Sequence, residues 1–261
     1  MAPQLNFVWN TARPCVHPLI APNGAVLTVD SPDDHPWHHG LWFAIKFVNG
    51  ENFWEEYDTF GVLRAGSVVV EEGVTTAEVE WVRPNGEVVV DETRQISCTE
   101  IDDDSYVIAW SEALVPRVDV TFDRTPFTTW GGYGGLTLRG APTFVDTKLC
   151  TSDGEFERRL GEATQWCAID GVARCESGEP ASAGVVIVDC SVGSVTTPWY
   201  ASTRAATYGA GWANFVNAAF LWNSPLAVAA GTSLELDYRV IVHSGRWSRE
   251  ECARRVLDLI R

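Results

Sequence analysis

Alternating apolar and polar residues recur along this chain in short runs that glycines and prolines separate. The clearest run is SLELDYRVIVHSG at 233–245, in which alternate residues from Leu234 to Val242 are apolar. A period of two places successive side chains on opposite faces of an extended strand, so each such run predicts a strand with one buried face. With 22 glycines and 13 prolines available as turn residues, the pattern predicts an antiparallel β protein.

Two further runs extend this pattern. TTAEVEWVRPNGEVVVDETRQI at 75–96 places Ala77, Val79 and Trp81 on one face, and β-branched residues resume after the turn residues PNGE. This order predicts a β-hairpin. SYVIAWSEALV at 105–115 is another apolar run of strand length. We therefore expect long strands in the middle of the chain as well as near its end.

Helical periodicity is confined to the C-terminus, RWSREECARRVLDLIR at 246–261, where Ser248 and Glu251 have the spacing of a capping box. An apolar stripe follows, made of Cys252, Val256, Leu257 and Ile260. No linker or internal repeat divides the chain. We predict a single domain over 1–261, a large all-β antiparallel β-sandwich with one C-terminal helix that covers one end of it.

The chain carries a strong negative charge, −16 from 19 basic and 35 acidic residues. Such a field repels nucleic acid and acidic membranes, so neither is an expected partner. No apolar run approaches the roughly 18 residues of a membrane span, and no basic start followed by an apolar stretch is visible at the N-terminus. Seven scattered cysteines without a CxxC spacing indicate reduced thiols. These features predict a cytoplasmic protein.

Three of the five histidines are concentrated in DDHPWHHG at 33–40. If the residues that follow are extended, His39 shares the apolar face of the strand, whereas His38 shares a mixed face with Trp42. His39 is then expected at the edge of the core, with a backbone carbonyl as its partner. His38 is expected in a cleft with Trp42, because an imidazole beside an indole suits a polar ligand.

The other histidines lie at strand ends or in stiff loops. His35 precedes a proline in what we expect to be an extended loop, and either of the two aspartates before it could orient its ring. His17 lies in a proline-bounded segment, and His243 ends the last long strand. A lone histidine of this kind is usually a hydrogen-bonded structural residue. As a set with His38, these histidines instead predict one shared catalytic site.

A metal is one alternative for that site. His35 and His38 have the H-x-x-H spacing of some metal ligands, and His17 or His243 could supply a third nitrogen. The spacing lies on a loop or strand rather than on the helix of a zinc motif. A divalent metal at His17, His35 and His38 and a site without any cofactor therefore both stay open.

Residues for ligand binding come from three further stretches. TTWGGYGGLTLRG at 128–140 has four glycines around Tyr133 and, if extended, places Tyr133 and Arg139 on one face. ENFWEEYD supplies a carboxylate, and TPWY supplies a stacking wall. Each stretch has a structural alternative, namely a glycine-rich bulge, a solvated carboxylate or a core indole. The predicted substrate-binding residues are Arg139, Trp42, Tyr133, Glu56 and Trp199.

Five stretches together resemble the PmoA-like family of bacterial proteins of unknown function, namely RPCVHPLIAPNG, DDHPWHHGLWFA, TPWY, NAAFLWNSPLAVAAG and LDYRVIVHSG. The likeness runs over nearly the whole chain. It implies a supersandwich like that of galactose mutarotases and a metabolic link to sugar-oxidising dehydrogenases. The name of the family is taken from a methane oxygenase. This chain is acidic and has no apolar span, so its sequence contradicts that name as a description of what it does. The resemblance implies site positions His17, His35, His38, His39, Arg139 and His243.

We therefore expect an enzyme that acts on a sugar or glycoside, such as an oxidised sugar that carries a ketone. A ketone acidifies the neighbouring C–H, so a histidine of near-neutral pKa could remove that proton. Arg139 or a metal would stabilise the enolate, and a second histidine would protonate the departing oxygen in an elimination that breaks a C–O bond. The expected base is His35 or His38, and the expected acid is His243.

Other functions fit parts of the same pattern. The same groups could open a sugar ring at its anomeric carbon, as in an aldose mutarotase or epimerase. A non-catalytic carbohydrate-binding protein would use the 12 tryptophans, whose flat faces suit sugar rings, but would not need the histidines. A cupin-like metal oxygenase would need bound iron. Metal analysis and NMR of candidate sugars distinguish these classes.

Overall fold

The fold was analysed in a computed structural model, which describes residues 5, 7–8, 13–126, 132, 134–191, 196–203 and 214–260. Within those ranges the chain forms three antiparallel sheets and one C-terminal helix. The short alternating runs of the sequence therefore become strands, and the prediction of an all-β sandwich is confirmed. No helix in this described part of the chain has the length and apolar character that crossing a membrane requires.

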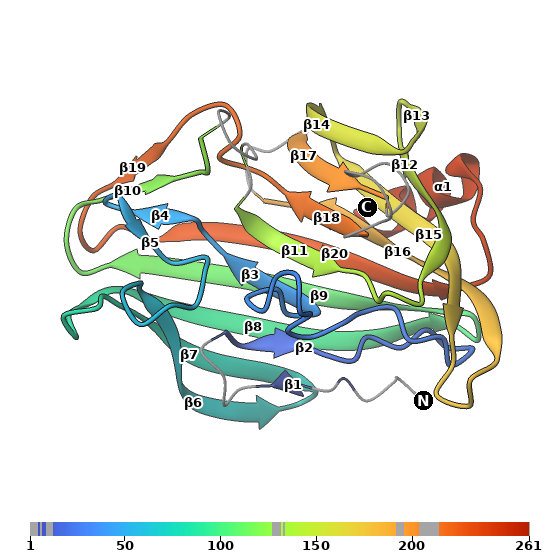
Figure 1. Cartoon of the computed structure of the whole chain (residues 1–261), viewed down its shortest axis with the longest axis horizontal. Coiled ribbons are helices and arrows are strands. Elements are labelled where there is room, and N and C mark those ends of the chain that lie inside the picture. Colours follow the sequence, from blue (N-terminus) through green and yellow to red (C-terminus); the bar gives the residue numbers. More distant parts are fainter. Residues whose placement is uncertain are drawn as a thin grey trace.

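One layer of the sandwich is a seven-stranded sheet whose strands come from distant parts of the sequence. In order across the sheet, the strands are β1 (Phe7–Val8), β2 (Cys15–Val16), β3 (Leu41–Ala44), β11 (Gly135–Arg139), β18 (Phe215–Ala218), β17 (Thr197–Ser202) and β14 (Arg158–Thr164). In Figure 1, β3, β11 and β18 lie in front of the long strands of the second layer.

The second layer is a nine-stranded sheet, which holds the longest strands. In order, these are β13 (Gly154–Phe156), β12 (Val145–Thr151), β15 (Trp166–Arg174), β16 (Pro180–Asp189), β20 (Leu234–Ser244), β9 (Ser105–Pro116), β8 (Val88–Asp102), β7 (Val74–Val82) and β6 (Val62–Glu71). The predicted hairpin is β7 and β8, whose turn contains Gly86 in the left-handed region at φ 89°.

A small four-stranded sheet completes the strands. Its members, in order, are β19 (Leu226–Val228), β10 (Val120–Asp123), β4 (Phe47–Val48) and β5 (Glu51–Asn52). Phe122 of β10 packs edge-on to Trp81 of β7, with ring centroids 6.3 Å apart. The small sheet therefore contributes to the same core as the two large sheets.

The main core lies between the layers and follows the alternation that the sequence predicts. On β20, Leu236, Tyr238, Val240 and Val242 face this core, and on β3 Leu41 and Phe43 do so. Trp42 of β3 and Ile241 of β20, which lie between these core residues, belong to separate apolar clusters on the outer faces of the two sheets. Each large sheet therefore has one face in the core and one face available for other contacts.

Helix α1 (Arg249–Leu259) covers the outer face of the nine-stranded sheet near β15 and β16 (Figure 1). Ser248 caps it, as predicted, by accepting a hydrogen bond from the Glu251 backbone N–H at 3.2 Å. The apolar stripe is narrower than predicted, because Leu257 and Ile260 are 49% and 40% exposed. Only Cys252 and Val256 are buried against the sheet.

A buried ionic group anchors the start of the seven-stranded sheet. Arg94 of β8 is fully buried with Glu92 and Glu112 and forms ion pairs with both carboxylates, at 2.7 and 2.8 Å. Burial raises the pKa of Glu112 well above its usual value. Arg94 also donates to the backbone carbonyl of Pro14 at 2.7 Å. This bond fixes the segment that leads into β2 and thus holds Cys15 in place.

Candidate functional site

The candidate site lies over the outer face of the seven-stranded sheet. Because Leu41 and Phe43 of β3 face the core, Trp42 faces outward, and it packs there with Phe215 of β18 and Tyr200 of β17. Arg139 of β11 lies on the same side as these rings, since Leu138 beside it faces the core. The loop that carries DDHPWHHG covers this aromatic floor.

Gly40 brings both neighbouring histidines to this face. Its φ of 49° is left-handed, so the strict alternation of β3 begins only at Leu41. His38 and His39 consequently both contact Trp42, with ring centroids 5.3 and 6.4 Å away. The expectation that His39 would turn to the core edge is therefore wrong, because the extended backbone on which it rested is interrupted at Gly40.

His35 and His38 stack on each other. The His35 N–H donates to the Pro32 carbonyl and the His38 N–H donates to the His35 carbonyl, each at 3.0 Å, so this segment consists of two turns rather than the expected extended loop. The turns place the two rings on one side, with centroids 4.7 Å apart and planes inclined by 24°.

Asp34 joins this histidine pair to Arg139. Its carboxylate accepts from His35 Nδ1 at 2.8 Å and from Arg139 Nη2 at 2.7 and 2.9 Å. Arg139 Nη1 also lies 3.2 Å from His38 Nδ1. Arg139 is buried, whereas the side chains of His35 and Asp34 are 33% and 37% exposed. These four residues are referred to below as the Asp34 cluster.

The partners determine where the ring protons lie. A guanidinium has no acceptor, so His38 Nδ1 accepts from Arg139, and neutral His38 carries its proton on Nε2. Burial and the Arg139 charge hold the pKa of His38 well below its usual value. A carboxylate only accepts, so His35 Nδ1 donates to Asp34 and the lone pair of the neutral His35 ring is on Nε2.

His39 is bound on both sides by carboxylates. Its Nδ1 donates to Asp30 at 2.5 Å, and its Nε2 donates to Glu56 at 2.8 Å. Arg13 is fully buried, donates to Glu56 at 3.4 Å and binds two backbone carbonyls at 2.7 and 3.0 Å. The predicted backbone-carbonyl partner of His39 is thus replaced by two acidic side chains.

Two adjacent imidazoles therefore have pKa shifts of opposite sign. Burial alone would lower the pKa of His39, but the hydrogen bonds to Asp30 and Glu56 outweigh it and raise the pKa above its usual value. The hydrogen bond from His39 lowers the pKa of Asp30, and the same kind of bond lowers that of Glu56 despite burial. Because both ring nitrogens of His39 donate to carboxylates, its geometry is that of an imidazolium, whereas the lowered pKa of His38 favours a neutral imidazole.

Aromatic rings border the exposed edge of His35. Trp37 is half-buried and lies edge-on to His35 at 5.4 Å between centroids. Tyr57 is 53% exposed and lies 5.7 Å from Trp37, and Phe60 lies 5.5 Å from Tyr57. These rings form an accessible aromatic rim next to the exposed Asp34 and His35 side chains.

His17 lies near the site but has its own partner. Its Nδ1 is 2.9 Å from the Thr28 hydroxyl. Burial lowers its pKa, and the charges of Asp30 and His39 also act on it. His17 is thus close to the carboxylate pair around His39, and no contact links it to the Asp34 cluster in the described residues.

His243 lies elsewhere. It is on β20, on the outer face of the nine-stranded sheet, where its ring stacks on Trp247 at 3.9 Å and 7°. Its Nδ1 donates to the Ser244 carbonyl at 3.2 Å, and burial lowers its pKa to about 4. The core separates this face from the Asp34 cluster, so the expectation that His243 shares one site with His35 and His38 is wrong.

The remaining predicted ligand-binding residues have mixed placements. Trp199 is fully buried in the main core and donates from Nε1 to the Thr164 carbonyl at 2.9 Å, which overturns its expected role as a stacking wall. Tyr200 faces outward instead. Trp42 is fully buried beneath His38, so it supports that ring rather than facing solvent. Tyr133 lies outside the described residues.

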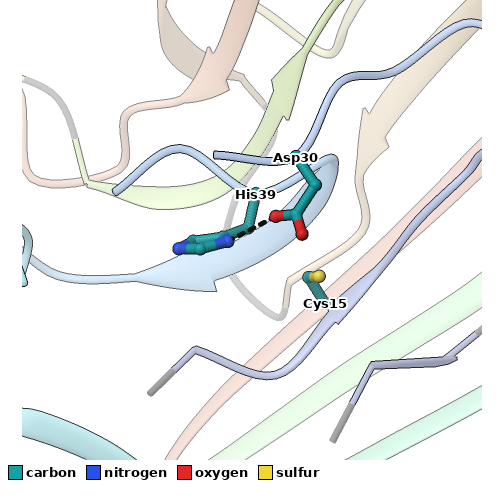
Figure 2. Close-up of side chains that lie close together, drawn as sticks. All are labelled: Cys15, Asp30 and His39. Carbon is teal, nitrogen blue, oxygen red and sulfur yellow. Dashed lines mark hydrogen bonds and ion pairs between the residues drawn. The ribbon is translucent and has the colours of Figure 1, made fainter. Parts of the chain in front are cut away.

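The predicted metal ligands do not gather. Among the residues that the structure describes, the ligand atoms of His17, His35 and His38 do not form a set of three. A physical reason is that Arg139 faces His38 Nδ1 and would repel a cation there. The set that does gather is Cys15, Asp30 and His39 (Figure 2).

Sequence reasoning missed the partners that give these histidines their states. Asp30 lies in none of the stretches singled out above, and Arg13 and Cys15 lie in RPCVHPLIAPNG without a spacing that ties them to the histidines. Each of the three meets the site through strand pairing or a buried contact. Trp37 is part of DDHPWHHG, and its place among three histidines was the available signal. Asp34 was foreseen as one of two aspartates that could orient His35.

The fold and these side chains define a β-sandwich protein with an imidazole, carboxylate and guanidinium cluster on an outer sheet face. The chain belongs to the family of unknown function DUF6807, whose sequence model matches residues 4–256. No curated protein matches the chain. A solved structure titled "Crystal Structure Analysis of HI1317" is similar over 91% of each chain at 9% identity and a TM-score of 0.33, and we draw nothing from so distant a likeness.

Proposed function

We propose that this protein is a carbohydrate-active enzyme that uses histidine acid–base chemistry on a sugar or glycoside. The observation that carries the proposal is the partly exposed His35 ring, which Asp34 holds through Nδ1 and Trp37 borders. A carboxylate that orients an imidazole is a common way to position a general base. The aromatic ring beside it offers an apolar face on which sugar C–H groups stack.

His35 is proposed as the base and His38 as the second proton-transfer group, in place of His243. In a sugar with a ring ketone, His35 Nε2 takes the proton from the carbon next to the ketone. The electrons of that C–H bond form the enolate, and their return expels the oxygen on the next carbon, which takes a proton. His38 stacks on His35 and carries its proton on Nε2. Arg139 is buried and acts through Asp34 and His38 as a positioning residue.

Two alternatives use the same surface differently. A mutarotase or epimerase would use the same imidazoles to move protons at the anomeric carbon. A non-catalytic carbohydrate-binding protein would use only the rim of Trp37, Tyr57 and Phe60. The exposed aromatic rim, taken by itself, favours the carbohydrate-binding protein. The experiment therefore has to distinguish sugar binding from sugar turnover.

The test follows candidate sugars and ring-ketone glycosides by NMR in deuterated water, with and without the protein. Deuterium uptake next to the ketone reports proton removal even when no bond breaks. We expect His35→Gln to lower the rate by about 10²- to 10⁴-fold, the usual contribution of one acid–base group. His243→Asn and Asp33→Asn are matched controls, since His243 lies on the other sheet and Asp33 is an exposed neighbour of Asp34, and both should keep the wild-type rate.

Two results would count against this proposal. Equal rates for wild type and His35→Gln would remove the histidine chemistry. Binding of sugars with neither exchange, anomer interconversion nor cleavage would identify a binding protein instead.

The proposal also covers the family resemblance, the partners and the cellular location of the protein. We propose that the PmoA-like resemblance and its galactose-mutarotase-like supersandwich apply to this chain, and that a sugar-oxidising dehydrogenase supplies the ketone. The net charge of −16 supports a small neutral partner rather than nucleic acid or a membrane. Seven unpaired cysteines support a reducing, cytoplasmic location.

A further inference from the structure

We infer that Cys15, Asp30 and His39 form a binding site for a divalent transition-metal ion of the zinc type. The Cys15 sulfur, an Asp30 carboxylate oxygen and a His39 ring nitrogen all lie within 4.8 Å of one another. Figure 2 shows the Asp30 carboxylate between the His39 ring and the Cys15 side chain, whose sulfur is directed toward them. A sulfur, an oxygen and a nitrogen ligand with a fourth position left for solvent match zinc sites of the open type.

The backbone holds these three ligands in a fixed arrangement. Cys15 of β2 pairs with Trp42 of β3. Asp30 and His39 face each other across an isolated antiparallel bridge. Two backbone hydrogen bonds flank this bridge. The Ser31 N–H donates to the His38 carbonyl and the Gly40 N–H donates to the Val29 carbonyl, each at 2.9 Å. The site is therefore built on paired backbone rather than on a free loop.

A second observation points to a metal ligand at His39. Histidines that bind metals usually donate their other ring N–H to a carboxylate, which fixes the ring and strengthens it as a ligand. When His39 binds through Nδ1, its Nε2 already donates to Glu56 at 2.8 Å. Glu56 is held in turn by the buried Arg13. The outer part of a carboxylate–histidine–metal arrangement is thus present.

The charges also balance. Without a metal, the carboxylates of Asp30 and Glu56 are offset by the imidazolium of His39 and the guanidinium of Arg13. A divalent ion that displaces one proton from His39 Nδ1 and one from the Cys15 thiol leaves the sum of charges unchanged. The exchange therefore leaves no uncompensated charge in this buried place.

The partly exposed Asp30 side chain gives an ion a path into the site. Cys15 and His39 are only 1% and 3% exposed, whereas the Asp30 side chain is 29% exposed. An ion can therefore enter past Asp30 and be enclosed by the other two ligands. Thiolate and imidazole ligands favour zinc, cobalt and related ions over magnesium or calcium.

The test uses the full chain after removal of metals with a chelator, titrated with Co²⁺. We expect a single cobalt ion per chain with the near-ultraviolet charge-transfer absorption of a cobalt–thiolate bond. This band should vanish in Cys15→Ser and persist in Cys252→Ser, a matched control because Cys252 is also 1% exposed but is a residue of α1, buried against the nine-stranded sheet. No such band in wild type, a band that persists in Cys15→Ser or an equal loss in both variants would overturn the inference.

Zinc affinity, measured by competition with a chromogenic chelator, tests the outer ligand. Glu56→Gln should weaken zinc binding by about 10- to 100-fold, whereas Glu55→Gln should not, because Glu55 binds Lys46 instead. If Cys15→Ser does not fold, alkylation of the wild type followed by mass spectrometry decides. Zinc must then protect Cys15 and leave Cys252 unchanged, and equal alkylation overturns the inference. None of these readouts needs a sugar, so they are independent of the proposed function.

Discussion

His38 and His39 are adjacent in sequence, yet they are expected to carry different charges at neutral pH. The difference comes from their partners, since Arg139 faces one ring and two carboxylates hold the other. Arg139 is 101 residues from His38 in sequence, and Asp30 is 9 residues from His39. The sequence could therefore indicate that these histidines matter, but not which of them is protonated.

At the scale of one residue, His243 should make the protein acid-sensitive. Its native pKa of about 4 lies below the usual value of 6.5, so the unfolded state binds its proton first as the pH falls. Neutral His243 contributes fully to the free energy of unfolding above pH 6.5. This contribution decreases as the pH falls and is lost by pH 4. Denaturant unfolding at pH 7 and pH 4 should show that His243→Asn loses about 3 kcal/mol less than wild type over this interval.

Comparing the two pH-dependent losses removes effects that both proteins share, including those of His38 and the carboxyl groups. The absolute stability of His243→Asn is expected to be lower at pH 7, because the stacking on Trp247 is lost. Identical pH-dependent losses for the two proteins would show that His243 titrates normally in the folded state.

At the scale of the strand, β3 shows what periodicity can and cannot establish. From Leu41 onward the alternation predicts the buried face correctly. It fails at His39 because Gly40 adopts a left-handed φ of 49°. The sequence shows a glycine there, but it does not show which glycines use their conformational freedom.

Gly40 should be hard to replace. A Cβ added there would lie 2.5 Å from the Val16 carbonyl oxygen and 2.9 Å from the His17 Cβ, in addition to the left-handed backbone. We expect Gly40→Ala to lower the free energy of unfolding by about 3 kcal/mol. Gly50→Ala is the matched control, with φ 79° and open space around its Cβ, and should cost about 1 kcal/mol. Equal losses, measured by denaturant unfolding, would contradict this account.

Strand β17 gives a second example at this scale. Trp199 and Tyr200 are adjacent aromatic residues, so one of them had to face the core and the other the outer face. Alternation alone could not decide between them. The core takes the larger ring of Trp199, and the Thr164 carbonyl satisfies its indole N–H.

At the scale of the whole molecule, the net charge of −16 should make stability depend on salt. Like charges are closer together in the folded chain than in the unfolded chain, and dissolved salt screens this long-range repulsion more than it weakens close ion pairs. We expect the free energy of unfolding to rise between about 0.01 and 0.2 M NaCl. A non-ionic osmolyte at equal osmolality is the control, and a steady fall with NaCl would contradict the expectation.

The architecture could be predicted much better than the grouping of side chains. Strand alternation, turn residues and one capped helix were sufficient for a sandwich, because these signals are local. The five histidines look like one set in the sequence, but the core divides them. His38 lies on the outer face of one sheet and His243 on the outer face of the other. Which faces meet is decided by strand order, and this order leaves no local signature.

The same strand order affects how the site is made during synthesis. β3 pairs with β11, which pairs with β18, so His38 meets Arg139 and Phe215 only when most of the chain is present. Contacts between such distant segments form slowly. A nascent polypeptide that has left the ribosome only as far as β9 contains all of its clustered histidines but neither of these partners. Any activity that depends on these contacts should therefore arise only after β18 has been synthesised and has paired with β11.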